Sequence, residues 1–324
     1  MGLRRHTELP GATASRLLRR NGGLYPPPMN TRHLVRQLLR RVLTGWLATL
    51  AVCLVLGGWG LSESEARAAM PDALRSASWS VVNDTVMGGR SSATITWNAA
   101  GHLEWRGRLS LENNGGFVSI RSGSAWADWA AFDAVEVVLE GQGRDVQVSV
   151  QREGQVLRAG GYRAMLPTKV AGETRAVIPL SAFIPKRFGR EVRAPSLARD
   201  KSRLGDWGLL IADKRQGQFS VTLKSLRGVR RTDKQRPSPG VREALLNAIE
   251  RGVPVFNSGD ADGCARIYTE TLRTAIESSG LPPGSWSQRL AETALVRASM
   301  EDRREAAWTL RRAMDAILRS LPEG

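Results

Sequence analysis

Two short segments of the chain combine glycine pairs with side chains that can bind a ligand. They read NDTVMGGRSS from Asn83 and LENNGGFVSIR from Leu111. Amide, carboxylate and guanidinium groups at loops can hydrogen-bond to sugar hydroxyls or to a protein partner's backbone, and several oxygens together can hold Ca²⁺. The candidate binding residues are Asn83, Asp84, Met87, Gly88, Gly89, Arg90, Ser91, Asn113, Asn114, Gly115, Gly116, Phe117 and Arg121.

The same residues admit a structural interpretation. Asn and Asp cap turns with their own backbone, and Gly supplies positive φ. For Asp84 alone the structural role is favoured, and for the whole cluster both interpretations stay open. If the cluster is a binding surface, its polar side chains converge at one end of the β-structure, and Asp84→Ala weakens binding without lowering the melting temperature. A large drop in melting temperature favours the structural role.

The sequence offers little material for catalysis after residue 68. It contains one histidine, His102, and one cysteine, Cys264. A Ser-His-Asp triad could use only His102, and a His/Cys metal site lacks ligands. We interpret His102 as an ordinary strand residue and Cys264 as a buried small apolar residue. The sequence therefore predicts a protein that is not an enzyme, with no catalytic residues, no metal and no cofactor.

The basic charge of the chain is concentrated near its start. The net charge is +16, and the first 68 residues contain ten Arg and three Glu, so seven of those charges lie there. No Lys/Arg run with interleaved aromatics follows, which argues against a nucleic-acid partner.

The N-terminal region, residues 1–68, is typical of a targeting segment. Four arginines between residues 32 and 41 precede a 20-residue uncharged and mostly apolar run at 42–61, and small residues at 66 and 68 form a signal-peptidase-like site. The run is a signal peptide or a membrane anchor, and either one sends the body across a membrane into a periplasm-like or lumen-like compartment.

From Ser78 to Arg231 the sequence reads as β-structure. Apolar and polar residues alternate in several short runs separated by Gly/Asn-rich turns, at 93–97, 102–109, 135–139, 146–150 and 219–223. Many short strands without long intervening helices predict a sandwich or jelly roll.

Four segments of this region resemble one known family. They are residues 79–91, 113–121, 178–185 and 208–214, with the sequences WSVVNDTVMGGRS, NNGGFVSIR, IPLSAFIP and GLLIADK. In order and spacing they are similar to the complex I intermediate-associated protein 30 family, over about residues 76–231. The resemblance implies a galactose-binding-domain-like jelly roll. For the mitochondrial members it also implies a non-catalytic role in assembling NADH:ubiquinone oxidoreductase.

Residues 232–240 form a Pro-rich linker, and a helical pattern covers 241–321. We expect four short helices: one from Val241 to Arg251 ended by Gly252, one starting near Asp260, one capped by Ser285 and one opened by Ser299. The pattern predicts a helical interaction domain that folds independently of the β domain. Its expected core is Leu245, Leu246, Ile249, Ile267, Leu272, Ile276, Leu290, Leu295, Leu310, Met314 and Ile317.

These features favour a non-enzymatic binding or assembly factor that aids biogenesis of a membrane respiratory or photosynthetic complex. Its partners would be proteins of that complex or of its assembly intermediate, with membrane contact through the N-terminal segment. The alternative is an exported carbohydrate-binding module. Such a module needs an exposed aromatic platform, for which Trp126 and Trp129 are the best candidates.

Overall fold

A computed structural model describes Leu74 and residues 78–123, 127–153, 161–199, 201 and 203–321. The apolar run at 42–61, the small-residue site after it, and Trp126 lie outside these residues.

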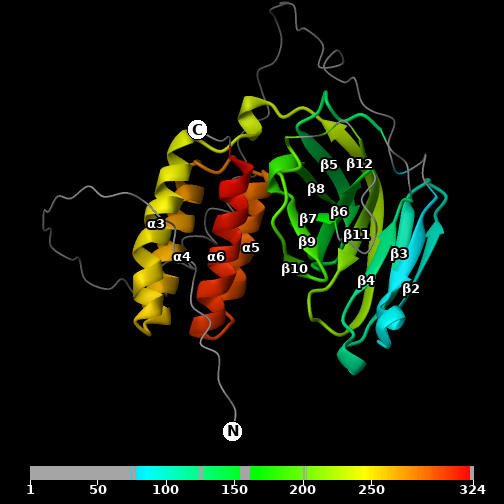
Figure 1. Ribbon diagram of the computed structural model, residues 1–324, viewed down its shortest axis with the longest axis horizontal. Coiled ribbons are helices and arrows are strands. Elements are labelled where there is room, and N and C mark those ends of the chain that lie inside the picture. The colour runs from blue at the N-terminus through cyan, green and yellow to red at the C-terminus, as the bar shows by residue number, and fades with distance from the viewer. Residues whose placement is uncertain are drawn as a thin grey trace, which may run out of the picture. The chain divides into compact units, whose positions relative to one another are not determined.

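The β region forms two antiparallel sheets (Figure 1). The first has seven strands in the order β1 (Ser80–Asn83), β4 (Val118–Arg121), β11 (Leu204–Ile211), β6 (Asp145–Arg152), β7 (Gly161–Pro167), β9 (Ile184–Arg187) and β10 (Arg190–Glu191). The second has five strands in the order β2 (Ser92–Trp97), β3 (Leu103–Leu109), β12 (Gly217–Val229), β5 (Ala134–Glu140) and β8 (Thr174–Pro179). The predicted β-sandwich is confirmed.

Alternation along the strands builds the core of the sandwich. On β6, Val146, Val148 and Val150 are fully buried, whereas Gln147 and Ser149 between them are only partly buried. Successive side chains of a strand point to opposite faces, so one face of β6 enters the core. Trp129 and Trp207 meet there with ring centroids 4.6 Å apart.

In the part of the chain that the structure describes, four short 3₁₀ helices connect the strands and the linker. They are η1 (Asp84–Met87), η2 (Glu112–Asn114), η4 (Leu180–Ala182) and η5 (Asp233–Gln235).

The C-terminal region contains the four predicted helices (Figure 1). They are α3 (Pro239–Asn257), α4 (Ala261–Glu277), α5 (Trp286–Ala298) and α6 (Arg303–Ser320). Asp260 and Ser285 cap α4 and α5 as expected, because their side chains accept from the amides of Gly263 and Gln288. Among the described residues, no helix has the length and apolar character needed to cross a membrane.

Three details of the helical prediction are wrong. Gly252 does not end α3, because it lies inside the helix, where a Cβ would come within 2.5 Å of the Tyr268 ring on α4. Its small size permits close helix packing and does not mark a helix end. Asp302, not Ser299, caps α6 by accepting from the amides of Arg304 and Glu305. Leu246 is exposed, because it lies on the outer face of α3.

The helices pack against the sandwich. Trp286 at the start of α5 is buried, and Arg297 of α5 forms an ion pair with Asp145 of β6. Buried apolar side chains of the helices and the sandwich form one continuous cluster. The helices after the linker therefore share an interface with the sandwich. That they fold independently of it stays a prediction.

Candidate functional site

The two glycine segments meet at one buried carboxylate. Asp84 Oδ1 accepts from the Ser91 amide at 2.8 Å, and Oδ2 accepts from the Ser91 hydroxyl at 2.6 Å. Oδ2 also accepts from the amides of Gly116 at 2.7 Å and Phe117 at 3.3 Å. We call Asp84, Ser91, Gly116 and Phe117 the Asp84 hub. It ties the segment after β1 to the segment before β4.

The hub keeps Asp84 ionised. Burial works to raise the pKa of the Asp84 carboxyl, but hydrogen bonds from Ser91, Gly116 and Phe117 outweigh it and hold the pKa below its ordinary value. The carboxylate is buried and its acceptor sites are occupied. Asp84 therefore links the two segments through hydrogen bonds, and whether it also contacts a partner stays a prediction.

The glycines make room for this carboxylate. A Cβ on Gly89 would lie 2.4 Å from Asp84 Cγ, and one on Gly115 would lie 2.6 Å from Asp84 Oδ2. Asn113 and Asn114 adopt positive φ of 54° and 56°, which Asn tolerates better than most residues. Close approach to Asp84 therefore explains one glycine of each pair, Gly89 and Gly115, and positive φ of 88° and 122° explains the other two, Gly88 and Gly116.

The hub turns apolar side chains toward solvent. Val86 is 74% exposed and Met87 71% exposed on η1, and Leu111 is exposed beside η2. Two contacts hold these tips together: an ion pair of 2.8 Å from Arg90 to Glu112, and a hydrogen bond of 3.3 Å from Asn113 Nδ2 to the Gly88 carbonyl. We call residues Thr85–Gly88, Arg90 and Leu111–Asn114 the loop surface.

The structure brings together most of the predicted site residues, but not all of them. Arg121 lies at the far end of β4, where it pairs with Ser80 in register and forms an ion pair of 3.2 Å with Asp206. Asn83 is only partly exposed, and its Oδ1 is buried with no hydrogen-bond partner within the described ranges. Ser91 is buried in the hub. Whether the remaining exposed residues bind a partner stays a prediction.

One of the two candidates for a sugar platform, Trp129, does not provide it. Trp129 is buried in the sandwich core against Trp207, so it cannot stack on a ligand. Among the described residues, the half-exposed tryptophan is Trp97, at the end of β2 opposite to Ser92 and hence remote from the hub.

The two residues considered for catalysis are both placed in structural settings. His102 lies in the β2–β3 turn, not in a strand, and its amide donates to Asn98 Oδ1 at 3.0 Å. Cys264 is buried in α4, where burial raises the pKa of its thiol. The described part of the chain shows no cluster of three or more His, Cys, Asp or Glu side chains able to hold a metal.

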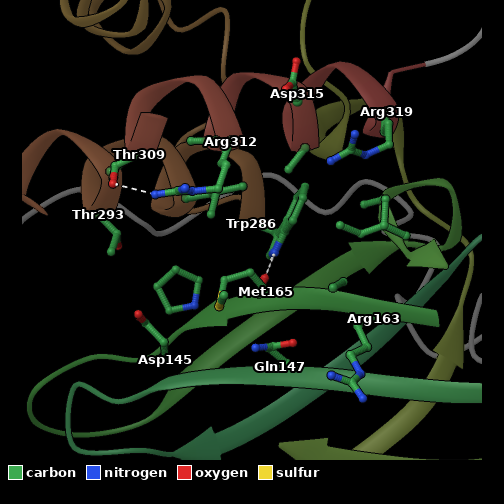
Figure 2. A pocket seen from close by; sticks show the side chains of 18 of the residues that line it. Asp145, Gln147, Arg163, Met165, Trp286, Thr293, Thr309, Arg312, Asp315 and Arg319 are labelled. Atoms are coloured by element: carbon green, nitrogen blue, oxygen red, sulfur yellow. Dashed lines mark hydrogen bonds between the residues drawn. The ribbon is translucent and has the colours of Figure 1, made fainter. Parts of the chain in front are cut away.

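Sequence reasoning missed a cavity of about 240 Å³ between the seven-stranded sheet and the helices α5 and α6 (Figure 2). Strands β6, β7, β9 and β10 line one side of it, and Trp286 reaches across from α5 to the Met165 carbonyl. Arg312 and Arg319 line it from α6. Their seven-residue spacing, two helical turns, is a signal that both lie on one face.

Comparisons with known proteins agree with this architecture. Residues 69–223 match the sequence model of the family described as complex I intermediate-associated protein 30. Among curated proteins, none matches the chain.

Several solved structures are similar to part of this chain, with low identity and low TM-scores. A family 11 carbohydrate-binding module from Clostridium thermocellum has 12% identity and a TM-score of 0.36, over 47% of this chain and 88% of that one. An agarase has 10% identity and a TM-score of 0.35, over 57% of this chain and 31% of that one. A family 29 carbohydrate-binding module has 11% identity and a TM-score of 0.27, over 50% and 99%. At these values the likeness concerns the fold alone.

Proposed function

Because residues 69–223 form a domain of the complex I intermediate-associated protein 30 family, we propose that this chain is a non-enzymatic assembly factor. It binds a protein of a membrane respiratory or photosynthetic complex, or of an intermediate in its assembly. The family's name supports a protein of such a complex as the partner. The loop surface supports binding through exposed apolar side chains.

The observation that carries this proposal is the exposure of apolar side chains on a rigid support. Val86 and Met87 are mostly exposed to water on a turn that the Asp84 hub ties to the second glycine segment. Exposed apolar side chains cost solubility, and apolar patches rimmed by polar groups are typical of protein contacts. Rigid support also lowers the entropy lost on binding. The loop surface therefore suits a protein partner better than a sugar.

The N-terminal region supports a location next to a membrane. Its basic residues precede the apolar run at 42–61, so the sandwich and the helices would lie on the far side of the membrane, either released or anchored. Protection of the sandwich from protease in intact cells, and its cleavage once the outer barrier is permeabilised, would support this arrangement. Cleavage resistance in permeabilised cells would contradict it.

The binding proposal is tested by photo-crosslinking from the loop surface. A photo-reactive residue replaces Val86 in the full chain, and crosslinked proteins are identified by mass spectrometry from detergent-solubilised membranes. We expect subunits of one membrane complex. The paired variant Val86→Ser with Met87→Ser should reduce their capture at least about tenfold, because truncating the few residues at the centre of an interface that dominate binding costs about 2 kcal/mol or more.

The matched control is Val170→Ser, which replaces a side chain of 83% exposure on the turn after β7. It should leave capture unchanged, and both variants should keep the wild-type melting temperature. Equal capture by the loop variant and the wild type would overturn the proposal. Binding on a glycan array that depends on Trp97 would support the carbohydrate alternative instead.

A further inference from the structure

The cavity between the sandwich and the helices gathers more positive than negative charge. Arg163 of β7 and Lys186 of β9 line it from the sheet, and Arg312 and Arg319 line it from α6. These side chains come from three elements spread over more than 150 residues of sequence, so tertiary packing alone brings them together.

Two of the carboxylates that line the cavity are paired with arginines. Asp145 forms an ion pair with Arg297, which also lines the cavity, and Asp315 accepts from Arg311 Nε at 2.9 Å. Glu191, on the exposed two-residue strand β10, is the remaining lining carboxylate and lies opposite Lys186 in register.

The cations keep binding capacity. Nε of Arg319 is buried and has no hydrogen-bond acceptor among the described residues. A buried donor without an acceptor costs free energy that a bound anion would recover. Arg312 donates to the Thr309 hydroxyl at 3.1 Å and approaches Glu305 only to 3.9 Å (Figure 2).

The pKa of Lys186 is lowered by burial and by the cations around it. Burial lowers the pKa of Lys186, and the nearby charges of Arg163, Arg319 and Arg312 lower it further, while Glu191 acts in the opposite direction. Lys224 on the five-stranded sheet behaves differently: a hydrogen bond from its ammonium group to Glu140 raises its pKa, and Glu173 adds to this. Lys186 therefore has a cationic environment, whereas Lys224 has partners of opposite charge.

Apolar side chains line the cavity beside the cations. Trp286, Leu290, Ala294 and Ala313 supply some of them from the two helices. The cavity thus offers cations for a charged group and apolar surface for a small organic body. Its volume of about 240 Å³ is below the roughly 300–1,000 Å³ of sites for drug-sized ligands, which limits the ligand to a small molecule or a headgroup.

We propose that this cavity binds a phosphate group, carried either by a small soluble phosphate ester or by an anionic lipid headgroup. A phosphate monoester carries a charge of about −1.5 to −2 at neutral pH, which matches the surplus of cations. Guanidinium groups bind phosphate oxygens in a bidentate manner, and the site offers two or three of them. The proposal does not depend on the assembly role, because the loop surface lies on other elements.

Isothermal titration of the purified full chain tests the proposal with three probes: inorganic phosphate, glycerol 3-phosphate, and phosphatidylcholine vesicles with or without phosphatidic acid. We expect at least one phosphate probe to bind, and Lys186→Gln to weaken its binding at least tenfold. The matched control Lys224→Gln should leave binding unchanged. Binding of the soluble probes identifies a phosphate ester as the ligand, and binding of the phosphatidic acid vesicles alone identifies a headgroup.

A second variant and a folding measurement show whether a loss of binding comes from the cavity or from misfolding. Arg319→Gln should also weaken binding at least tenfold, and both variants should keep the wild-type circular dichroism. The proposal is overturned if no phosphate probe binds, or if its binding survives both substitutions. Binding of an aspartate-rich peptide in place of phosphate would overturn it as well. The variant with Val86→Ser and Met87→Ser should retain phosphate binding, which separates this proposal from the assembly role.

Discussion

The indole Nε1 of Trp286 donates a hydrogen bond of 2.7 Å to the main-chain carbonyl of Met165, a residue 121 positions earlier in the chain (Figure 2). Trp286 begins α5, and Met165 lies in β7. The bond and the burial of the indole fix the helical region to the outer face of the seven-stranded sheet.

We predict that Trp286→Ala destabilises the chain by about 3–5 kcal/mol, because it removes a buried indole and leaves a cavity. Trp286→Phe should cost less, since it keeps most of the apolar contact and loses the hydrogen bond, which is worth about 1 kcal/mol. Urea unfolding followed by tryptophan fluorescence measures both values.

The control for this prediction is Trp308→Ala. Trp308 packs against Phe256 within the helical region, with ring centroids 5.9 Å apart. If the helices fold independently, Trp308→Ala lowers only a helical transition and leaves the β-sheet signal unchanged. One shared transition in every variant would show that sandwich and helices unfold as a unit and would contradict independent folding.

We predict that Asp84→Ala destabilises the sandwich by about 2–3 kcal/mol, because it leaves the buried donors of Ser91 and Gly116 without their charged acceptor. Thermal unfolding monitored by near-ultraviolet circular dichroism measures the loss. An unchanged melting temperature with weaker partner capture would return Asp84 to a direct binding role.

The Asp84 effect should depend on pH in a defined direction. Because the folded state lowers the pKa of Asp84, its contribution is present above the ordinary value of 3.8 and is lost as the pH falls through the lower folded pKa. The difference in unfolding free energy between wild type and Asp84→Asn should therefore shrink below pH 3.8. A difference that stays constant into that range would argue against ionised Asp84 as the acceptor.

We predict that Gly89→Ala costs about 1–3 kcal/mol, since its Cβ would overlap the Asp84 carboxyl group. Gly240→Ala is the matched control, because nothing lies within 4 Å of the added Cβ in the first turn of α3. That change should be neutral or stabilise by about 0.4–1 kcal/mol. Similar melting temperatures for both variants would show that the loop adjusts without cost.

We predict that Lys186→Gln does not lower the melting temperature at pH 7 and that Lys224→Gln does not raise it. The folded state lowers the pKa of Lys186 through burial and through Arg163 on β7 and Arg312 and Arg319 on α6, with Glu191 on β10 opposing them. Protonated Lys186 thus opposes folding at neutral pH, and this penalty fades as the pH rises through its lowered folded pKa toward 10.5. If Lys186→Gln has a higher melting temperature than the wild type, the difference should decrease over the same pH range in a series of thermal melts.

Local patterns were sufficient to predict the elements. The valines of β6 alternate because one face of the strand is buried, and Asp260 and Ser285 cap helices through contacts within three residues. The prediction that Gly252 ends a helix was wrong because the group that requires a glycine there, the ring of Tyr268, lies sixteen residues away in the sequence. A local pattern carries no information about such a partner.

The sequence predicted the part of the candidate site that depends on local patterns, and it did not predict the part that depends on distant partners. The glycine and amide residues marked the two loops, but the donors that reach Asp84 depend on how these two loops pack against each other. The residues around Trp129 in the sequence do not distinguish a buried tryptophan from an exposed one. Its burial becomes visible only in the fold, where it packs against Trp207. The cations of the cavity lie on different strands and on α6, so no short pattern joins them.

The Asp84 hub has a consequence for how this surface can diversify. Within the described part of the chain, the hydrogen bonds to the Asp84 carboxylate come from Ser91, Gly116 and Phe117, and none comes from the tip residues Val86 and Met87. The position of the tip is thus specified by the hub and not by the tip side chains. Mutation can exchange the tip side chains while the loop keeps its shape, so related chains can acquire different partners without a new fold.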